Sequence, residues 1–97
     1  DGIAIRAPIP EAVADMRETV HDVVLVSDDA IRSAMRLAWR AGGVTVEPAG
    51  AAGLAALLDP AHPWRGQRVA TVLCGGNCTD QQVRDWLLGV DSRGQSP

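Results

Sequence analysis

The stretch VTVEPAGAAGLAALL, residues 44–58, joins a short apolar run to a helical pattern with almost no polar side chains. The β-branched residues at 44–46 favour a strand, and Pro48 has the fixed φ that suits the first turn of a helix. Inside that helix, Gly50 and Gly53 each cost about 1 kcal/mol relative to alanine. A close neighbour must offset this cost, so we expect another segment to pack directly against these glycines.

The sequence on either side of this stretch alternates in the same way. An uninterrupted apolar run at 23–26 and a mostly apolar run at 67–73 predict two further strands, because strands covered on both faces lack polar alternation. Apolar residues at helical spacing predict helices at 11–20, 27–41, 49–58 and 81–88, the last capped by Thr79 or Asp80. Three strands alternating with helices predict an α/β fold, a parallel sheet flanked by helices in three layers.

The helix predicted at 27–41 has the clearest end signals. Ser27, Asp28 and Asp29 offer N-cap oxygens, and the glycine pair at 42 and 43 predicts a left-handed C-cap. One stripe of this helix is expected to face the core, and it consists of Ile31, Met35, Ala38 and Trp39. The opposite stripe carries Arg32, Arg36 and Arg40, which we expect to form a solvated face.

The composition is that of an ordinary globular protein, with 46% hydrophobic and 22% charged residues among 97. The net charge of −3 at pH 7 argues against a nucleic-acid partner, because nucleic-acid binders expose a basic face. No apolar stretch approaches the roughly 20 residues that span a membrane. The two cysteines are too few for a small secreted scaffold, which favours a reducing cytoplasm.

Two segments stand where open parallel sheets bind ligands, beyond the carboxyl ends of strands. They are residues 46–53 and 74–77, and each places small residues directly after an apolar run. Neither matches a phosphate-binding pattern such as GxGxxG. On local grounds, Gly75 and Gly76 indicate a tight turn that needs positive φ, and Glu47 is a solvated carboxylate or a charge at a helix N-terminus.

The cysteines and histidines give weaker indications. Cys74 and Cys78 are four residues apart, but His21 and His62 are distant in the sequence, so we predict no metal site and place both histidines at the surface. A reactive thiolate at Cys74 would need a histidine or a helix N-terminus beside it. That alternative stays open, and no residue is assigned a catalytic role.

Four ordered motifs resemble one enzyme family. They are DGIA at 1–4, DVVLVSDDAI at 22–31, VEPAGAAGLAA at 46–56 and VLCGGN at 72–77. In order and spacing they resemble the carboxyl-terminal region of the serine/threonine dehydratases and serine racemases, which are pyridoxal-phosphate enzymes. The resemblance implies the tryptophan synthase β-like fold (fold type II). The resemblance also implies that residues 1–90 are the carboxyl-terminal part of the large, cofactor-binding domain, and that residues 91–97 are a polar tail.

The resemblance also implies which residues meet the cofactor. The implied cofactor-binding residues are Cys74, Gly75, Gly76, Asn77, Glu47 and Gly50. In the family, the residue at the position of Cys74 forms a hydrogen bond with the pyridine nitrogen, and the two glycines let backbone pack under the ring. A neutral partner at that nitrogen leaves the ring unprotonated, which favours β-elimination over transamination.

The chain departs from the family in one respect: it contains no lysine. The family holds its cofactor covalently through a lysine near the amino terminus, and that bond needs an amine. We therefore expect the last third of a cytoplasmic enzyme, severed at or near Asp1. The parent would deaminate L-serine or L-threonine to 2-oxo acids by β-elimination. The 97 residues alone are expected to be inactive and not to bind pyridoxal phosphate.

The expected partners follow from that interpretation. They are the missing amino-terminal part of the parent, its amino-acid substrate, and further copies of the chain, because a three-stranded fragment exposes sheet edges and apolar faces. Two alternatives stay open. One is a stand-alone ligand-binding or assembly module that kept the fold without catalysis, and the other, within the family, is an amino-acid racemase.

Overall fold

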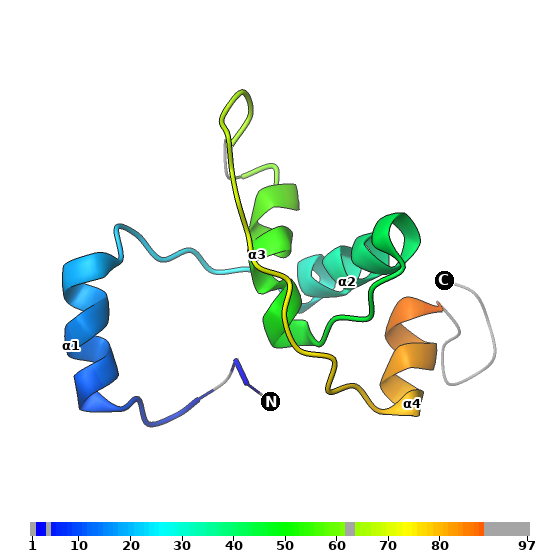
Figure 1. Cartoon of the computed structure of the whole chain (residues 1–97), viewed down its shortest axis with the longest axis horizontal. Helices are drawn as coiled ribbons and strands as arrows, with labels where there is room; N and C mark the ends of the chain where they lie inside the picture. Colours follow the sequence, from blue (N-terminus) through cyan, green and yellow to red (C-terminus); the bar gives the residue numbers. More distant parts are fainter. Residues whose placement is uncertain (1, 4, 62–63, 89–97) are drawn as a thin grey trace.

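The computed structural model describes residues 2–3, 5–61 and 64–88 of the chain. In this part the chain forms helices joined by irregular segments (Figure 1). The helices are α1 (Pro10–Thr19), α2 (Asp28–Gly42), α3 (Pro48–Leu58) and α4 (Asp80–Gln82), which a π-helical turn, η1 (Val83–Leu87), continues directly. Each predicted helix is confirmed to within one residue at either end. The polar tail predicted at 91–97 lies outside the described residues.

Helix α2 begins and ends as its sequence predicts. The Ser27 hydroxyl accepts a hydrogen bond from the backbone N–H of Ala30 at 3.1 Å, which satisfies one free donor of the first turn. At the other end, Gly43 has a φ of 64° and its N–H donates to the carbonyl of Trp39 at 2.9 Å. Glycine adopts this left-handed conformation without strain.

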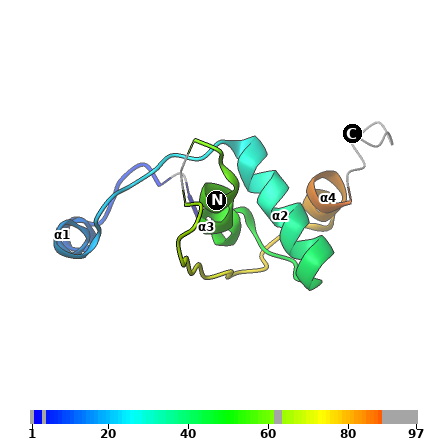
Figure 2. The same ribbon diagram turned by 90° about the horizontal axis from the view of Figure 1, so that it is seen from above.

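The core lies where α2 crosses α3, and the two helices lie side by side in both views (Figure 2). Its buried residues are Ile31, Ala34, Met35, Ala38, Val46, Ala51, Ala55 and Leu87. Half of them are alanines, whose short side chains allow the helix backbones to approach closely. Three positions of the stripe predicted on α2 are buried as expected, but the prediction was wrong for Trp39, whose side chain is 38% exposed.

The end of the described chain folds back onto α2. Thr79 begins α4 with a capping box, in which the Thr79 hydroxyl and the Gln82 side chain each accept a hydrogen bond from the other residue's N–H. The following turn, η1, buries Leu87 against α2. This contact places the last helical segment on the same core as α3.

Two arginines of α2 hold that segment, so the prediction of a wholly solvated arginine face was wrong. The Arg36 Nε donates to the carbonyl of Trp86 at 2.8 Å, across 50 residues of sequence. The Arg32 guanidinium lies 5.9 Å from the centre of the Trp86 ring, within cation–π range, and forms an ion pair with Asp29 at 3.2 Å. The spacing that predicted a solvated stripe carried no information about a partner so far along the chain.

The predicted parallel sheet is not confirmed, because the described residues contain no β-strand. Residues 23–26 form an irregular connection between α1 and α2, and Val23 and Leu25 there are 69% and 90% exposed (Figure 1). Residues 67–73 run alongside α3 instead of beside another extended segment. A strand exists only through backbone bonds to a neighbour, and β-propensity alone supplies none.

Helix α1 lies apart from the other helices in both views (Figures 1 and 2). It forms at the predicted place, with Pro10 in its first turn and the acidic Glu11 beside it. None of its residues is buried, and Met16 on its predicted apolar face is 48% exposed. In the part of the chain that the structure describes, no helix is long and apolar enough to cross a membrane.

The hydrogen bond from Arg36 to Trp86 predicts a measurable loss when it is removed. Arg36→Ala should lower the free energy of unfolding by about 1–2 kcal/mol, because a charged donor to a partly buried carbonyl is lost. Denaturant titrations followed by tryptophan fluorescence measure this. Arg40→Ala, at an exposed position of the same helix, is the matched control and should change it by less than about 0.5 kcal/mol. Equal losses from the two variants would contradict the assignment.

Candidate functional site

Residues 74–77, where the sequence predicts a tight turn, are shaped by glycine and are called the turn below. Gly75 has a φ of 75°, the left-handed conformation expected from the sequence. The N–H of Cys78 donates to the carbonyl of Gly76 at 2.8 Å, so the chain bends again at Asn77 before Thr79 begins α4. Apart from this local hydrogen bond, residues 71–79 contain no sharp bend or hydrogen-bonded β-turn, so the tight turn predicted across 74–77 forms only at its last residues.

This turn rests on the amino-terminal end of α3. The backbone N–H of Glu47, the N-cap residue of α3, donates to the carbonyl of Gly75 at 2.9 Å. The Glu47 carboxylate occupies the space where a side chain at position 75 would lie. The structure thus brings Glu47 into direct contact with the turn, as the sequence predicted for the two segments.

Gly50 allows the closest approach in this region. A Cβ at position 50 would overlap the backbone carbonyl oxygen of Cys74 and would lie 2.8 Å from Cγ1 of Val46. One turn further along α3, a Cβ at Gly53 would meet the hydroxyl of Thr71. The neighbour expected from the two costly glycines is therefore the segment that leads into the turn.

Cys78, which was considered from the sequence only for a metal pair with Cys74, also lies at this site. Its half-buried sulfur lies 3.8 Å from the carbonyl oxygen of Val46, within reach of a weak S–H···O hydrogen bond. Burial raises the pKa of the Cys78 thiol, and the nearby Glu47 carboxylate raises it further. The thiol therefore stays protonated at neutral pH. Its place directly after the turn is the one signal that could have identified it.

The opening residues also reach this end of α3. Gly2 has a φ of 78°, and a Cβ there would lie 3.2 Å from the Cβ of Ala49. Three of the four motifs that carried the family resemblance therefore meet at the first turn of α3, although they are far apart in the sequence. The motif order alone did not reveal this meeting point.

The turn has one packed side and one open side. Val46 and Gly50 beneath it are buried, and Glu47 is half-buried. The residues of the turn itself are all exposed, and they are Cys74, Gly75, Gly76 and Asn77. The open side offers a thiol, an amide and backbone groups with little bulk, a surface that a flat molecule can approach closely.

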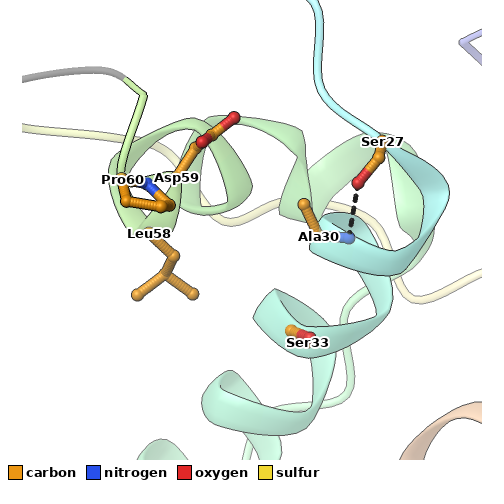
Figure 3. A pocket seen from close by; sticks show the side chains of 6 residues that line it. All are labelled: Ser27, Ala30, Ser33, Leu58, Asp59 and Pro60. Atoms are coloured by element: carbon orange, nitrogen blue, oxygen red, sulfur yellow. Dashed lines mark hydrogen bonds between the residues drawn. The ribbon is translucent and has the colours of Figure 1, made fainter.

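Two other features do not add to this site. Among the described residues, no three His, Cys, Asp or Glu side chains lie close enough together to hold a metal ion. A pocket of about 270 Å³ lies between the start of α2 and the end of α3 (Figure 3). Its lining residues are Ser27, Ala30, Ser33, Leu58, Asp59 and Pro60. The Ser27 hydroxyl there already serves as the cap of α2. His21 is exposed, as expected, whereas His62 lies outside the described residues.

Comparison with known proteins gives one consistent result. A family model described as pyridoxal-phosphate dependent enzyme matches residues 1–75. L-threo-3-hydroxyaspartate ammonia-lyase of Pseudomonas sp. is 38% identical over 74 residues, 76% of this chain and 23% of that protein. Serine racemase of Oryza sativa subsp. indica is 36% identical, over 64% of this chain and 20% of that protein. L-threonine ammonia-lyase of Thermotoga maritima is 34% identical, over 79% of this chain and 19% of that protein.

The chain thus spans about a fifth of the length of these curated relatives. No solved structure matches it significantly.

The two glycines of α3 give a matched pair of substitutions. Gly50→Ala should lower the free energy of unfolding by about 1–3 kcal/mol, because a backbone carbonyl cannot rotate away from the new methyl group. Gly53→Ala meets only a threonine side chain, which can change rotamer, and it gains up to about 1 kcal/mol of helix propensity. Denaturant titration of both variants checks this. A stabilising Gly50→Ala would show that the turn does not dock on α3.

Proposed function

The chain belongs to the family of pyridoxal-phosphate-dependent enzymes, and from this premise we propose that it forms one wall of the active site of an ammonia-lyase. The proposed reaction is the deamination of L-serine or L-threonine to a 2-oxo acid by β-elimination. Two of the relatives named above are ammonia-lyases that act on 3-hydroxy amino acids, which supports this choice. The observation that carries the proposal is the turn at 74–77, docked on α3 on one side and open on the other.

The residues of the turn fit such a cofactor. The space beneath it is filled by Gly50, Val46 and the Glu47 carboxylate, so the turn cannot sink into the core. Its open side carries small residues, which allow an aromatic ring to approach the backbone. We propose that Cys74 meets the ring nitrogen, that Gly75 and Gly76 lie under the ring, and that Asn77, Glu47 and Gly50 complete this wall. When bound, pyridoxal phosphate supplies an electron sink for the bonds at the α-carbon of an amino acid.

The contribution of Cys74 is a neutral hydrogen-bonding group. A thiol can donate or accept a weak hydrogen bond, and it brings no carboxylate that would hold a proton on the ring nitrogen. A neutral thiol at this position would make the ring a weaker electron acceptor than a carboxylate would. We expect this to favour loss of the β-hydroxyl group of the substrate over transamination. Behind the turn, the Glu47 N–H fixes the carbonyl of Gly75, which holds the neighbouring Cys74 backbone in position.

The proposed reaction needs an amine from residues outside these 97. All nine basic residues other than histidine are arginines, whose guanidinium groups stay protonated and do not act as amine nucleophiles. We therefore propose that a lysine-bearing segment completes the site and that these 97 residues alone do not turn over amino acids. The chain's share of its relatives' length, about a fifth, supports the same view. Exposed apolar residues at 23–26 and 69–73 are surfaces where that segment, or a second copy, would associate.

Racemisation is a second candidate function. The similarity to serine racemase of rice favours it, and the two reactions share the removal of the α-proton. A racemase returns the proton to the opposite face, whereas a lyase expels the β-hydroxyl group. Formation of D-serine from L-serine, measured beside 2-oxo acid, separates the two.

A chimaera tests the proposed function directly. In L-threonine ammonia-lyase of Thermotoga maritima, this chain should replace the segment that it matches. We expect the soluble chimaera to bind pyridoxal phosphate, seen as visible absorbance, and to form a 2-oxo acid from L-threonine. The isolated 97-residue chain, assayed in parallel, should form none. A well-folded chimaera that binds no cofactor, or turnover by the isolated chain, would overturn the proposal.

The two cysteines should respond differently within that chimaera. Cys74→Asp should lower turnover about tenfold or more, a barrier increase of at least about 1.4 kcal/mol, because a carboxylate would hold a proton on the ring nitrogen. Cys78→Ala should have little effect, since its sulfur faces the Val46 carbonyl below the turn. Steady-state 2-oxo acid formation measures both. Equal losses would refute the distinct roles given to the two thiols.

A further inference from the structure

The turn is attached to the helices at both of its ends. On the α3 side, the carbonyl of Cys74 lies against Gly50. The N–H of Glu47 also donates to the carbonyl of Gly75 there. On the other side, the chain enters α4 directly after Thr79 and continues through η1, which lies against α2 (Figure 2). The proposed function depends on the first attachment and assigns nothing to the second.

The second attachment is a continuous helical run that begins just after Cys78. The capping box joins Thr79 and Gln82 through two hydrogen bonds, so the first turn of the run has a fixed direction. Helical backbone then continues without a break as far as Leu87. Because so short a helix moves as one body, the position of its last turn sets the position of Thr79 and Cys78 at its start.

The last turn of this run is held on α2 by contacts of different kinds, and one of them fixes its direction. Leu87 is buried, but apolar contact is non-directional. The Arg32 guanidinium lies 5.9 Å from the centre of the Trp86 ring, a contact that tolerates small shifts. The Arg36 Nε, in contrast, donates to the Trp86 carbonyl at 2.8 Å, and a hydrogen bond weakens steeply when its geometry is distorted. Arg36 therefore orients the run on α2.

The rest of the core does not depend on this run. Among the buried residues that the structure describes, Leu87 is the only one that comes from it. Release of residues 78–87 would thus leave the packing of α2 on α3 in place, as a local opening of the chain. The contact of the Cys78 sulfur with the Val46 carbonyl would be lost in the same step.

We propose that Arg36 is a positioning residue for the turn. Its hydrogen bond to Trp86 fixes the end of the helical run, and the run holds Cys78 and Asn77 in place beside the start of α3. Asn77 belongs to the proposed cofactor wall, so a consequence for pyridoxal phosphate rests on the proposed function. The consequence for the half-buried Cys78, which becomes exposed when the run is released, does not.

Two substitutions of similar length isolate the hydrogen bond. Arg36→Gln keeps an N–H donor at the position of the arginine Nε, whereas Arg36→Met has a methyl group there and cannot donate. Both remove the positive charge, so any effect of that charge on the thiol is the same in the two variants. Arg40→Met is the matched control, because Arg40 is exposed on the same helix.

The measurement is the rate at which iodoacetamide alkylates Cys78 in the full chain at constant pH. Both cysteines lie in one tryptic peptide, residues 69–84, whose fragment ions separate Cys78 from Cys74. We expect Arg36→Met to raise the Cys78 rate at least about fivefold, because losing a hydrogen bond from a charged donor favours local opening. Arg36→Gln and Arg40→Met should stay within about twofold of the wild type. The rate at exposed Cys74 should not change.

Urea at low concentration separates positioning from a general loss of stability. A local opening exposes little surface, so the Cys78 rate in Arg36→Met should change little with urea well below the unfolding midpoint. The proposal is overturned if the Met and Gln variants alkylate Cys78 at equal rates. It is also overturned if the rate in Arg36→Met rises with urea as steeply as global unfolding does.

The consequence for the cofactor is tested in the chimaera with L-threonine ammonia-lyase, built to include residues 1–88 of this chain. Arg36→Met should raise the dissociation constant of pyridoxal phosphate at least about threefold relative to Arg36→Gln, because the wall is in place for a smaller fraction of the time. Visible absorbance measures both constants, and equal values would contradict this consequence. A chimaera that binds no cofactor in any form would overturn the proposed function, while the Cys78 rates still decide the role of Arg36.

Discussion

The missing side chain at position 50 is the constraint on which the site depends. Because Gly50 has no Cβ, the backbone carbonyl of Cys74 can lie against α3, where any larger residue would overlap it. The hydrogen bond from Glu47 to Gly75 and the contact of Cys78 with Val46 then fix the rest of the turn. Helix α3 is itself packed on α2 through alanines, so an exposed turn is connected directly to the core. The turn gains its order from this close packing, since in the described residues no sheet supports it.

Signals within a few residues of each other were enough to predict the helices. The caps at Ser27, Gly43 and Thr79 each depend on groups three to five residues apart, and each is among the candidates that the sequence offered. The strands failed for the opposite reason, since residues 23–26 have the right composition but no neighbouring backbone to pair with. The contact of Arg36 with Trp86 was likewise hidden, because it joins positions 50 residues apart. Helix stripes show which side chains share a face, and only tertiary structure shows what covers that face.

The two segments predicted to form the site lie in contact, although the sheet that was used to place them is not confirmed. Residues 46–53 and 74–77 were expected together because parallel strands end at a common edge, and they do meet. Their contact comes instead from a glycine helix that accepts a backbone carbonyl and from one backbone hydrogen bond. The motifs also named the family that the comparisons find, although the family match ends at residue 75, within the turn. The half-buried position of Cys78 was not predicted from the sequence, because burial, which distinguishes it from Cys74, is not a local property.

The charged side chains of α2 stabilise packing, whereas the charged side chain at the turn affects a nearby thiol. Two arginines of α2 contact the last helical segment. Arg36 donates a hydrogen bond to the Trp86 carbonyl, and the Arg32 guanidinium lies over the Trp86 ring. At the turn, the nearby charge is the Glu47 carboxylate, which opposes ionisation of the thiol closest to the core. A site built this way presents neutral donors and acceptors to whatever lies on its open side. Under the proposed function, such a site would orient and tune a bound ring, and the covalent chemistry would need a lysine from outside these residues.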